Sequence, residues 1–267
     1  MSATAPARLI VERDARVLRL TLSNPTARNA LHPDMYAAGR QAFESARTDP
    51  EVRAVVLAGE GDIFCAGGNL RRLLENRDKD PALQYASIDA MHAWVRAIRA
   101  CDKPVVAAVE GAAAGAGFSL VLACDQVVAA EDASFTMAYV KVGLSPDGGA
   151  THGLATRLPY PLAFELACTG APVGAARLHA LGVVNRVVPR GQALAGAMEL
   201  ARAFADGPPR VIARIKRLLD GAAAPGLPAH LDRERDAFLD SLFDTDAGEG
   251  IRAFLDKRKP RFGGDSH

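Results

Sequence analysis

Two glycine-rich segments have the composition of loops that bring backbone N–H groups to a ligand. Residues 64–70 read FCAGGNL and residues 111–119 read GAAAGAGFS, and each follows a predicted strand. Their small side chains would let a ligand approach the backbone closely. The second segment leads into a predicted helix, whose first N–H groups favour negative charge. Side by side, the two loops could aim two donors at one developing oxyanion, where a single donor is worth about 3 kcal/mol of barrier.

Each loop taken alone also suits a tight turn or a close contact between a helix and a strand, and this alternative stays open. The second loop contains GAG but lacks the full GxGxxG pattern, so dinucleotide binding is only weakly indicated. Neither loop continues into the GK[ST] of a phosphate-binding P-loop. The oxyanion interpretation therefore needs support from the rest of the chain.

The composition is that of an ordinary soluble globular protein. Of the 267 residues, 49% are hydrophobic and 24% charged, and the formal net charge is +1. The length allows one large domain, or one domain with an appendage. A near-neutral charge gives no electrostatic reason to expect a nucleic-acid partner.

The cysteines and the apolar segments exclude further classes of protein. The four cysteines form no CxxC pair and the histidines no metal-binding cluster, so we expect no metal and interpret all four thiols as buried and reduced: Cys65, Cys101, Cys124 and Cys168. The first residues lack the apolar core of a signal peptide, and no apolar run is long enough to cross a bilayer. We therefore expect a cytoplasmic protein that does not interact with membranes.

The elements that would position the loops alternate between strands and helices. A β-hairpin is predicted over residues 9–22 with its turn at 13–16, and a helix from Pro33 to about Thr48. Buried strands are predicted near 52–59 and over Pro104–Val109, a helix over Gly117–Leu122, and two short strands and another glycine-rich loop within 124–149. This order favours an α/β fold with crossover connections. From about Gly207 only helical patterns remain, so we predict a core over residues 1–206 and a helical appendage over 207–267.

The chain resembles the crotonase (enoyl-CoA hydratase/isomerase) superfamily over nearly its whole length. The resemblance lies in NPTARNAL, FCAGGNL, KPVVAAVEGAAAGAGFSLVLACD, FTMAYVKVGLSPDGGATHGLATRLP and the final IRAFLDKRKPRF, in the family's order. It implies a spiral of repeated ββα units, a homotrimer or a dimer of trimers, and an acyl-CoA thioester substrate. Coenzyme A would be part of that substrate, and no other cofactor is implied.

The resemblance also assigns roles to individual residues. The two oxyanion donors would be the N–H groups of Gly68, after the Ala66–Gly67 pair, and of Ala116. Coenzyme A would be held near Ala66 and by three further residues: Arg28, Phe254 and Lys257. The last two are predicted in the final helix, from where they could act within one chain or across a subunit boundary. Plain packing for Phe254, and solvated surface charge for the other two, are the alternatives.

Two positions depart from a hydratase of this family, which uses two glutamates to add water across a double bond. The first glutamate is replaced by Ser119 and the second by Tyr139. Neither a serine nor a tyrosine hydroxyl has an ordinary pKa suited to acid–base work near neutral pH. Hydration by the two-glutamate mechanism is therefore not expected.

Two other residues could supply the missing proton chemistry. Asp147, in LSPDGG, stands where several relatives of the isomerase, ring-opening and dehalogenase types carry a catalytic acid, although Pro-Asp-Gly is also turn chemistry. His92 lies on a helix predicted over Ser87–Arg99, near the place of the catalytic histidine of 4-chlorobenzoyl-CoA dehalogenase. A packed or surface histidine is the alternative for His92.

The sequence is most similar to the phenylacetate-pathway branch of the superfamily, including proteins described as oxepin-CoA hydrolase, alternative type. We therefore expect proton-transfer isomerisation or ring opening of an unsaturated or aromatic-derived acyl-CoA. In that reaction Asp147 would move the proton, and Tyr139 and Ser119 would polarise or position the reacting groups. The alternatives are an enoyl-CoA hydratase with atypical acid–base residues, an aryl-CoA dehalogenase using an aspartyl ester, and a non-catalytic CoA-binding scaffold.

Overall fold

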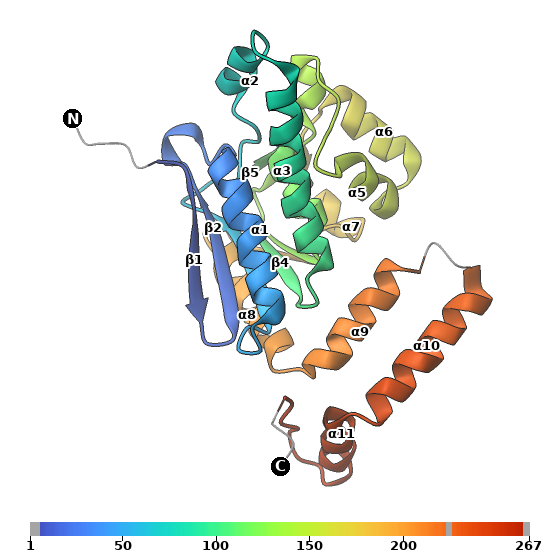
Figure 1. Ribbon diagram of the computed structural model, residues 1–267. Coiled ribbons are helices and arrows are strands. Elements are labelled where there is room, and N and C mark those ends of the chain that lie inside the picture. The colour runs from blue at the N-terminus through green and yellow to red at the C-terminus, as the bar shows by residue number, and fades with distance from the viewer. Residues whose placement is uncertain (1–5, 223–225, 264–267) are drawn as a thin grey trace.

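A six-stranded sheet forms the centre of the computed structural model, which describes residues 6–222 and 226–263 (Figure 1). Its strand order is β1-β2-β3-β4-β6-β9, and only the β1–β2 hairpin is antiparallel. The strands are β1 (Arg8–Asp14), β2 (Val17–Ser23), β3 (Ala54–Gly59), β4 (Val105–Val109), β6 (Gln126–Ala130) and β9 (Arg186–Val188). The parallel strands are joined by crossover connections, as the alternating pattern predicts.

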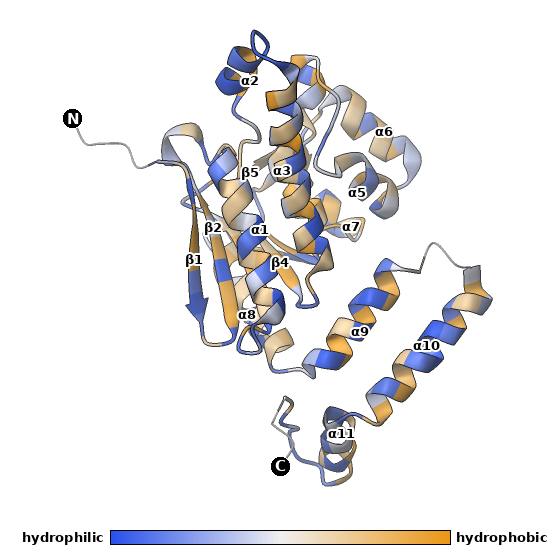
Figure 2. Ribbon diagram, viewed as in Figure 1, coloured by the Kyte–Doolittle hydropathy of each residue, from blue (hydrophilic) through white to orange (hydrophobic). Residues whose placement is uncertain are grey.

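Both faces of this sheet are buried, because side chains alternate between two apolar layers. Leu57 and Ala107 face the layer that contains α1 (Pro33–Thr48), α3 (Pro81–Ala100) and α4 (Ala116–Ala123). Ala58 and Ala108, their neighbours in sequence, face α8 (Ala193–Ala205). Strand β2 is accordingly among the most hydrophobic parts of the ribbon in Figure 2.

A second sheet has three strands, and its first strand lies within the segment predicted as the second glycine-rich loop. Its order is β5 (Ala112–Ala114), β7 (Ser134–Thr136) and β8 (Val173–Gly174). The chain runs β4-β5-α4 and then β6-β7 followed by the 3-10 turn η2 (Ala138–Val142) and α5 (Ala150–Arg157). Each unit gives one strand to each sheet, which confirms the predicted spiral of ββα units.

The remaining elements of the core complete this arrangement. They are η1 (Pro25–Ala27), α2 (Leu70–Asn76), α6 (Tyr160–Thr169) and α7 (Ala175–Ala180). Helix α1 has the predicted bounds, whereas α3 begins six residues before the predicted Ser87, because Asp80 caps it and Pro81 opens it. The prediction of four buried thiols was wrong for Cys168, which is exposed on α6.

Three helices follow the core and lie to one side of it in Figure 1. They are α9 (Pro209–Asp220), α10 (Gly226–Leu242) and α11 (Thr245–Leu255), in agreement with the predicted helical appendage. Helix α11 ends at Leu255, so placing Lys257 in the last helix was wrong: Lys257 lies in the turn beyond it with φ +54°. In the part of the chain that the structure describes, no helix is both long and apolar enough to span a membrane.

Candidate active site

The first glycine-rich loop is held in place from both sides by backbone hydrogen bonds. The N–H of Leu31 donates to the carbonyl of Gly67 at 2.8 Å, and the N–H of Ala66 donates to the carbonyl of Arg28 at 3.0 Å. Gly67 adopts φ +97°, and a Cβ there would lie 2.8 Å from the carbonyl oxygen of Ala114. Only glycine fits such a position, so the loop approaches the second loop closely.

The second loop runs beside the first. The N–H of Cys65 donates to the carbonyl of Ala112 at 3.0 Å, and the N–H of Ala114 donates back to the carbonyl of Cys65 at 2.9 Å. A Cβ built on Gly67 would lie 3.5 Å from the nitrogen of Ala116. The two loop segments that carry the predicted oxyanion donors therefore lie next to each other.

Both donor N–H groups lack a backbone acceptor. Ala116 is the first residue of α4, where the helix supplies no partner for its N–H. Among the backbone hydrogen bonds of the described residues, neither Gly68 nor Ala116 acts as a donor. Two free N–H groups beside each other, one at a helix N-terminus, can stabilise a negative oxygen.

Three of the predicted site residues, Ser119, Tyr139 and Asp147, form one hydrogen-bonded cluster. The hydroxyl of Tyr139, in η2, donates to Oδ1 of Asp147 at 2.6 Å. Oγ of Ser119, on α4, lies 3.0 Å from the Tyr139 hydroxyl and 3.1 Å from the carbonyl oxygen of Asp147. Ser119 is buried, and Tyr139 and Asp147 are partly buried. The side chain of Asp147 is thus held by tyrosine, and its backbone by serine.

This cluster lies against the two glycine-rich loops. A Cβ on Gly115 would lie 3.9 Å from the Cα of Gly67 and 3.9 Å from ring carbons of Tyr139. Burial, followed by the nearby charge of Asp147, raises the pKa of Tyr139 above its ordinary value. The phenol therefore stays protonated and serves as a hydrogen-bond donor, not as a base.

His92 joins the cluster through the backbone of the same turn. The N–H of Gly148 donates to Nε2 of His92, on α3, at 3.2 Å. Gly148 adopts φ +61°, and a Cβ there would lie 2.8 Å from Cε of Met91 and 3.1 Å from Cβ of Ser119. Because Nε2 accepts this bond, its lone pair is engaged by the N–H of Gly148, the residue that follows Asp147 in the turn.

The predicted CoA-contacting residues fall into two groups. Ala66 is part of the first loop, and its N–H donates to the carbonyl of Arg28 (φ +52°), as described above. Phe254 and Lys257 are exposed, and α11 lies at the opposite end of the molecule from α2 in Figure 1. Within one chain they are therefore not brought to the Asp147 cluster.

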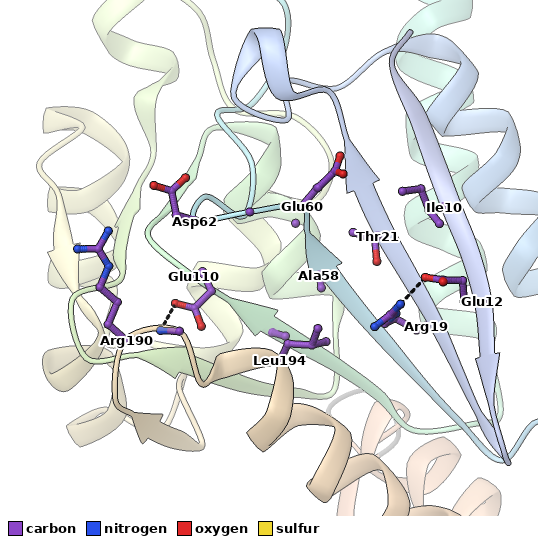
Figure 3. A pocket seen from close by; sticks show the side chains of 14 residues that line it. Ile10, Glu12, Arg19, Thr21, Ala58, Glu60, Asp62, Glu110, Arg190 and Leu194 are labelled. Carbon is purple, nitrogen blue, oxygen red and sulfur yellow. Dashed lines mark hydrogen bonds and ion pairs between the residues drawn. The ribbon is translucent and has the colours of Figure 1, made fainter. Parts of the chain in front are cut away.

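A separate cavity of about 420 Å³ lies on the α8 side of the main sheet (Figure 3). It is lined by Ala58 and Ala108 and by several charged side chains, but by none of the predicted site residues. Glu110 accepts hydrogen bonds from the N–H groups of Gly191 and Ala193, at 3.1 and 2.7 Å, and so holds the start of α8. Glu12 and Arg19, which also line the cavity, form an ion pair with each other. The described residues contain no cluster of three or more metal-ligating side chains.

Two polar side chains whose charge or hydroxyl could act at the site, Tyr36 and Arg72, are not indicated by the sequence. Burial raises the pKa of Tyr36 to about 12, and the charges of Arg72 and Asp147 act on it in opposite directions. Tyr36 occupies an apolar position of an amphipathic helix, which normally indicates packing. In the sequence, the one sign of another role for Tyr36 is its hydroxyl group, because an aliphatic side chain would fill this apolar position equally well.

Comparison with known proteins identifies the family of this chain. The enoyl-CoA hydratase/isomerase family profile matches residues 12–265, and the chain belongs to this family. Enoyl-CoA hydratase EchA19 of Mycobacterium tuberculosis is 36% identical over 265 residues, with 95% of each chain covered. 1,2-Epoxyphenylacetyl-CoA isomerase of Escherichia coli is 35% identical over 249 residues, covering 93% of this chain and 95% of the relative.

A solved structure shows the same fold at higher identity. The crystal structure of an enoyl-CoA hydratase from Polaromonas sp. JS666 superposes with a TM-score of 0.94 at 50% identity, covering 96% of this chain and all of that one. The resemblance to the crotonase superfamily is thus confirmed. Membership of a hydratase/isomerase family supports an enzyme and is consistent with an acyl-CoA substrate.

Proposed function

We propose that this protein moves a proton on an acyl-CoA thioester through an enolate held by the N–H groups of Gly68 and Ala116. The carboxylate of Asp147 removes a proton α or γ to the thioester, and the electron pair moves onto the thioester oxygen. The two donors stabilise that oxyanion. Asp147, now a carboxylic acid, returns the proton to a different carbon, so atoms and charge balance without a further reactant.

The observation that carries this proposal is the 2.6 Å hydrogen bond from Tyr139 to Asp147. It holds a carboxylate beside the two loops, while Ser119 occupies the place of one hydratase glutamate and Tyr139 that of the other. One carboxylate suffices to shuttle a proton between carbons, whereas the two-glutamate hydration needs both. Isomerisation, or the ring opening that follows from the same enolate, therefore fits the residues better than ordinary hydration.

Solvent exchange tests this proposal. The full-length protein is incubated in deuterated buffer with a panel of saturated, unsaturated and aryl acyl-CoAs, and deuterium at the α and γ carbons is measured by mass spectrometry. Wild type should exchange at least one substrate, and Asp147→Asn should slow that exchange about 10²–10⁴-fold, the usual range for loss of a general base. Tight thioester binding without exchange or turnover in either protein would overturn the mechanism.

We further propose that the chain assembles as a homotrimer or a dimer of trimers, in which a neighbouring subunit brings Phe254 and Lys257 to the coenzyme. Phe254 is 83% exposed in the single chain, an unusual state for phenylalanine. An apolar cavity of about 450 Å³ also opens between α9, α10 and α11. Analytical ultracentrifugation of the full chain should give three or six times the mass of 28.1 kDa, and a monomer would contradict the proposal.

A further inference from the structure

Two helices that leave the first oxyanion loop carry polar side chains that the proposed proton transfer does not use. Leu31 pairs with Gly68 in a parallel bridge. From this point α1 begins after its cap His32, and α2 begins after Asn69, which caps it by accepting from the N–H of Arg72 at 3.2 Å. Tyr36 and Arg72 therefore lie about one helical turn from the same donor loop.

The ring of Tyr36 is buried, but its hydroxyl is free to bind a ligand. The residue is 7% exposed and packs in the main apolar layer. Among the described residues its hydroxyl has no hydrogen-bond partner, and its oxygen is not one of the fully buried atoms that lack one, so the hydroxyl can be reached from outside the apolar layer. The charges of Arg72 and Asp147 act on the pKa of this hydroxyl in opposite directions.

The guanidinium of Arg72 has donors to spare. Its two terminal nitrogens lie 3.4 and 3.3 Å from Oγ of Ser87 on α3, and its side chain forms no ion pair with a carboxylate of the described chain. A guanidinium carries five N–H donors in a planar fork that matches a carboxylate. Contact with one hydroxyl leaves most of that fork available.

We propose that Tyr36 and Arg72 bind a carboxylate on the acyl group, beyond the carbons that react. This inference rests on the proposed function, because it places the acyl group between the donor loop and Asp147. The phenol and the guanidinium would each donate to the substrate carboxylate, and charge-assisted bonds of this kind are the strong ones. The guanidinium would also offset the repulsion between that carboxylate and Asp147.

Matched thioesters test the inference. Dissociation constants are measured by calorimetry for ω-carboxyl acyl-CoAs of four to eight carbons and for the monocarboxylic acyl-CoA of each length, for example adipyl-CoA and hexanoyl-CoA. Wild type should prefer the ω-carboxyl ligand by about tenfold at the best length. Arg72→Met should remove the preference and Tyr36→Phe should lower it severalfold, whereas Arg71→Met, a control with the same charge change on α2, should retain it.

Two results would overturn the inference. One is the absence of any ω-carboxyl preference in wild type at every length. The other is equal weakening of both ligands by Arg72→Met, which would assign Arg72 to the coenzyme part that all thioesters share. Solvent exchange with a normal monocarboxylic ligand would then still support the proposed function. If wild type prefers the ω-carboxyl thioester but catalyses no solvent exchange, the proton-transfer mechanism is contradicted, whereas the carboxylate-binding role of Tyr36 and Arg72 is supported.

Discussion

At the scale of single residues, the candidate site is defined by a hydrogen-bonded network of three side chains. Tyr139 and Ser119 hold the side chain and backbone of Asp147 in one network. The residues in this network were identified from the resemblance to a family, because sequence spacing alone does not place residues 119, 139 and 147 together. The hydrogen bonds that join them, and the role of His92 as acceptor for Gly148, came only from the structure.

Replacing Tyr139 by Phe tests the positioning of Asp147. Because burial and the charge of Asp147 raise the pKa of Tyr139, the phenol stays protonated up to and beyond pH 10, the region where an ordinary tyrosine ionises. Tyr139→Phe should therefore lower kcat/KM for exchange about 10- to 100-fold without changing the shape of the pH profile between about pH 6 and 10. A new or lost limb in that range would contradict the assigned role of donor.

The same shift has a consequence for stability. A tyrosine whose native pKa is raised above its unfolded value of about 10 costs no stability below that pH. Above it, the unfolded chain releases the proton first, so the free energy of unfolding falls as pH rises. Urea unfolding at pH 9 and 11 should show a smaller fall for Tyr139→Phe than for wild type, and identical falls would contradict the shift.

At the scale of elements, helices and strands with a local sequence signal were predicted correctly, and an element that depends on long-range pairing was not. Helix α1 was predicted from Pro33 to about Thr48 and has these bounds, because Pro33 marks its first turn and the apolar spacing is helical. Strand β5 was predicted as a loop, because three alanines carry no strand preference and their pairing with β7 is a long-range contact. The helical appendage was visible from its pattern, but the turn at Lys257 was not.

Gly117→Ala tests whether close contact between the loops maintains the donor geometry. A Cβ at Gly117 would lie 2.7 Å from both Cβ and the carbonyl oxygen of Cys65, so the first loop must move. We expect a loss of about 1–3 kcal/mol in the free energy of unfolding and a large loss of exchange. Gly174→Ala, with open space around its Cβ, is the control, and similar behaviour of the two variants would contradict the argument.

At the scale of the whole molecule, a buried ion pair joins the appendage to the core. Lys216, on α9, is 8% exposed, and its Nζ lies 2.7 Å from Oδ2 of Asp125 and 3.2 Å from the carbonyl oxygen of Lys103. Asp125 follows α4, which carries Ala116 and Ser119. The attachment of α9 therefore lies at the far end of the helix that begins at the proposed oxyanion hole.

Lys216→Met measures the strength of this attachment. The variant leaves Asp125 with Arg99 at 3.7 Å as its remaining cation, so we expect a loss of about 2–3 kcal/mol in the free energy of unfolding, somewhat below the usual cost of breaking a buried pair. Lys259→Met is the control, because Lys259 is 86% exposed and lies 4.0 Å from Asp206. Equal denaturation midpoints for the two variants would show that the buried pair does not anchor α9.

In the proposed mechanism, the N–H groups of Gly68 and Ala116 polarise a thioester carbonyl. Isotope-edited infrared spectroscopy measures this directly, with a ¹³C=O-labelled, non-reacting acyl-CoA bound to the wild-type protein. We expect a carbonyl stretch at lower frequency than in water, and a smaller shift in Gly117→Ala, where the loops are pushed apart. A bound thioester whose carbonyl stretch equals its value in solution would show that these N–H groups do not polarise the carbonyl.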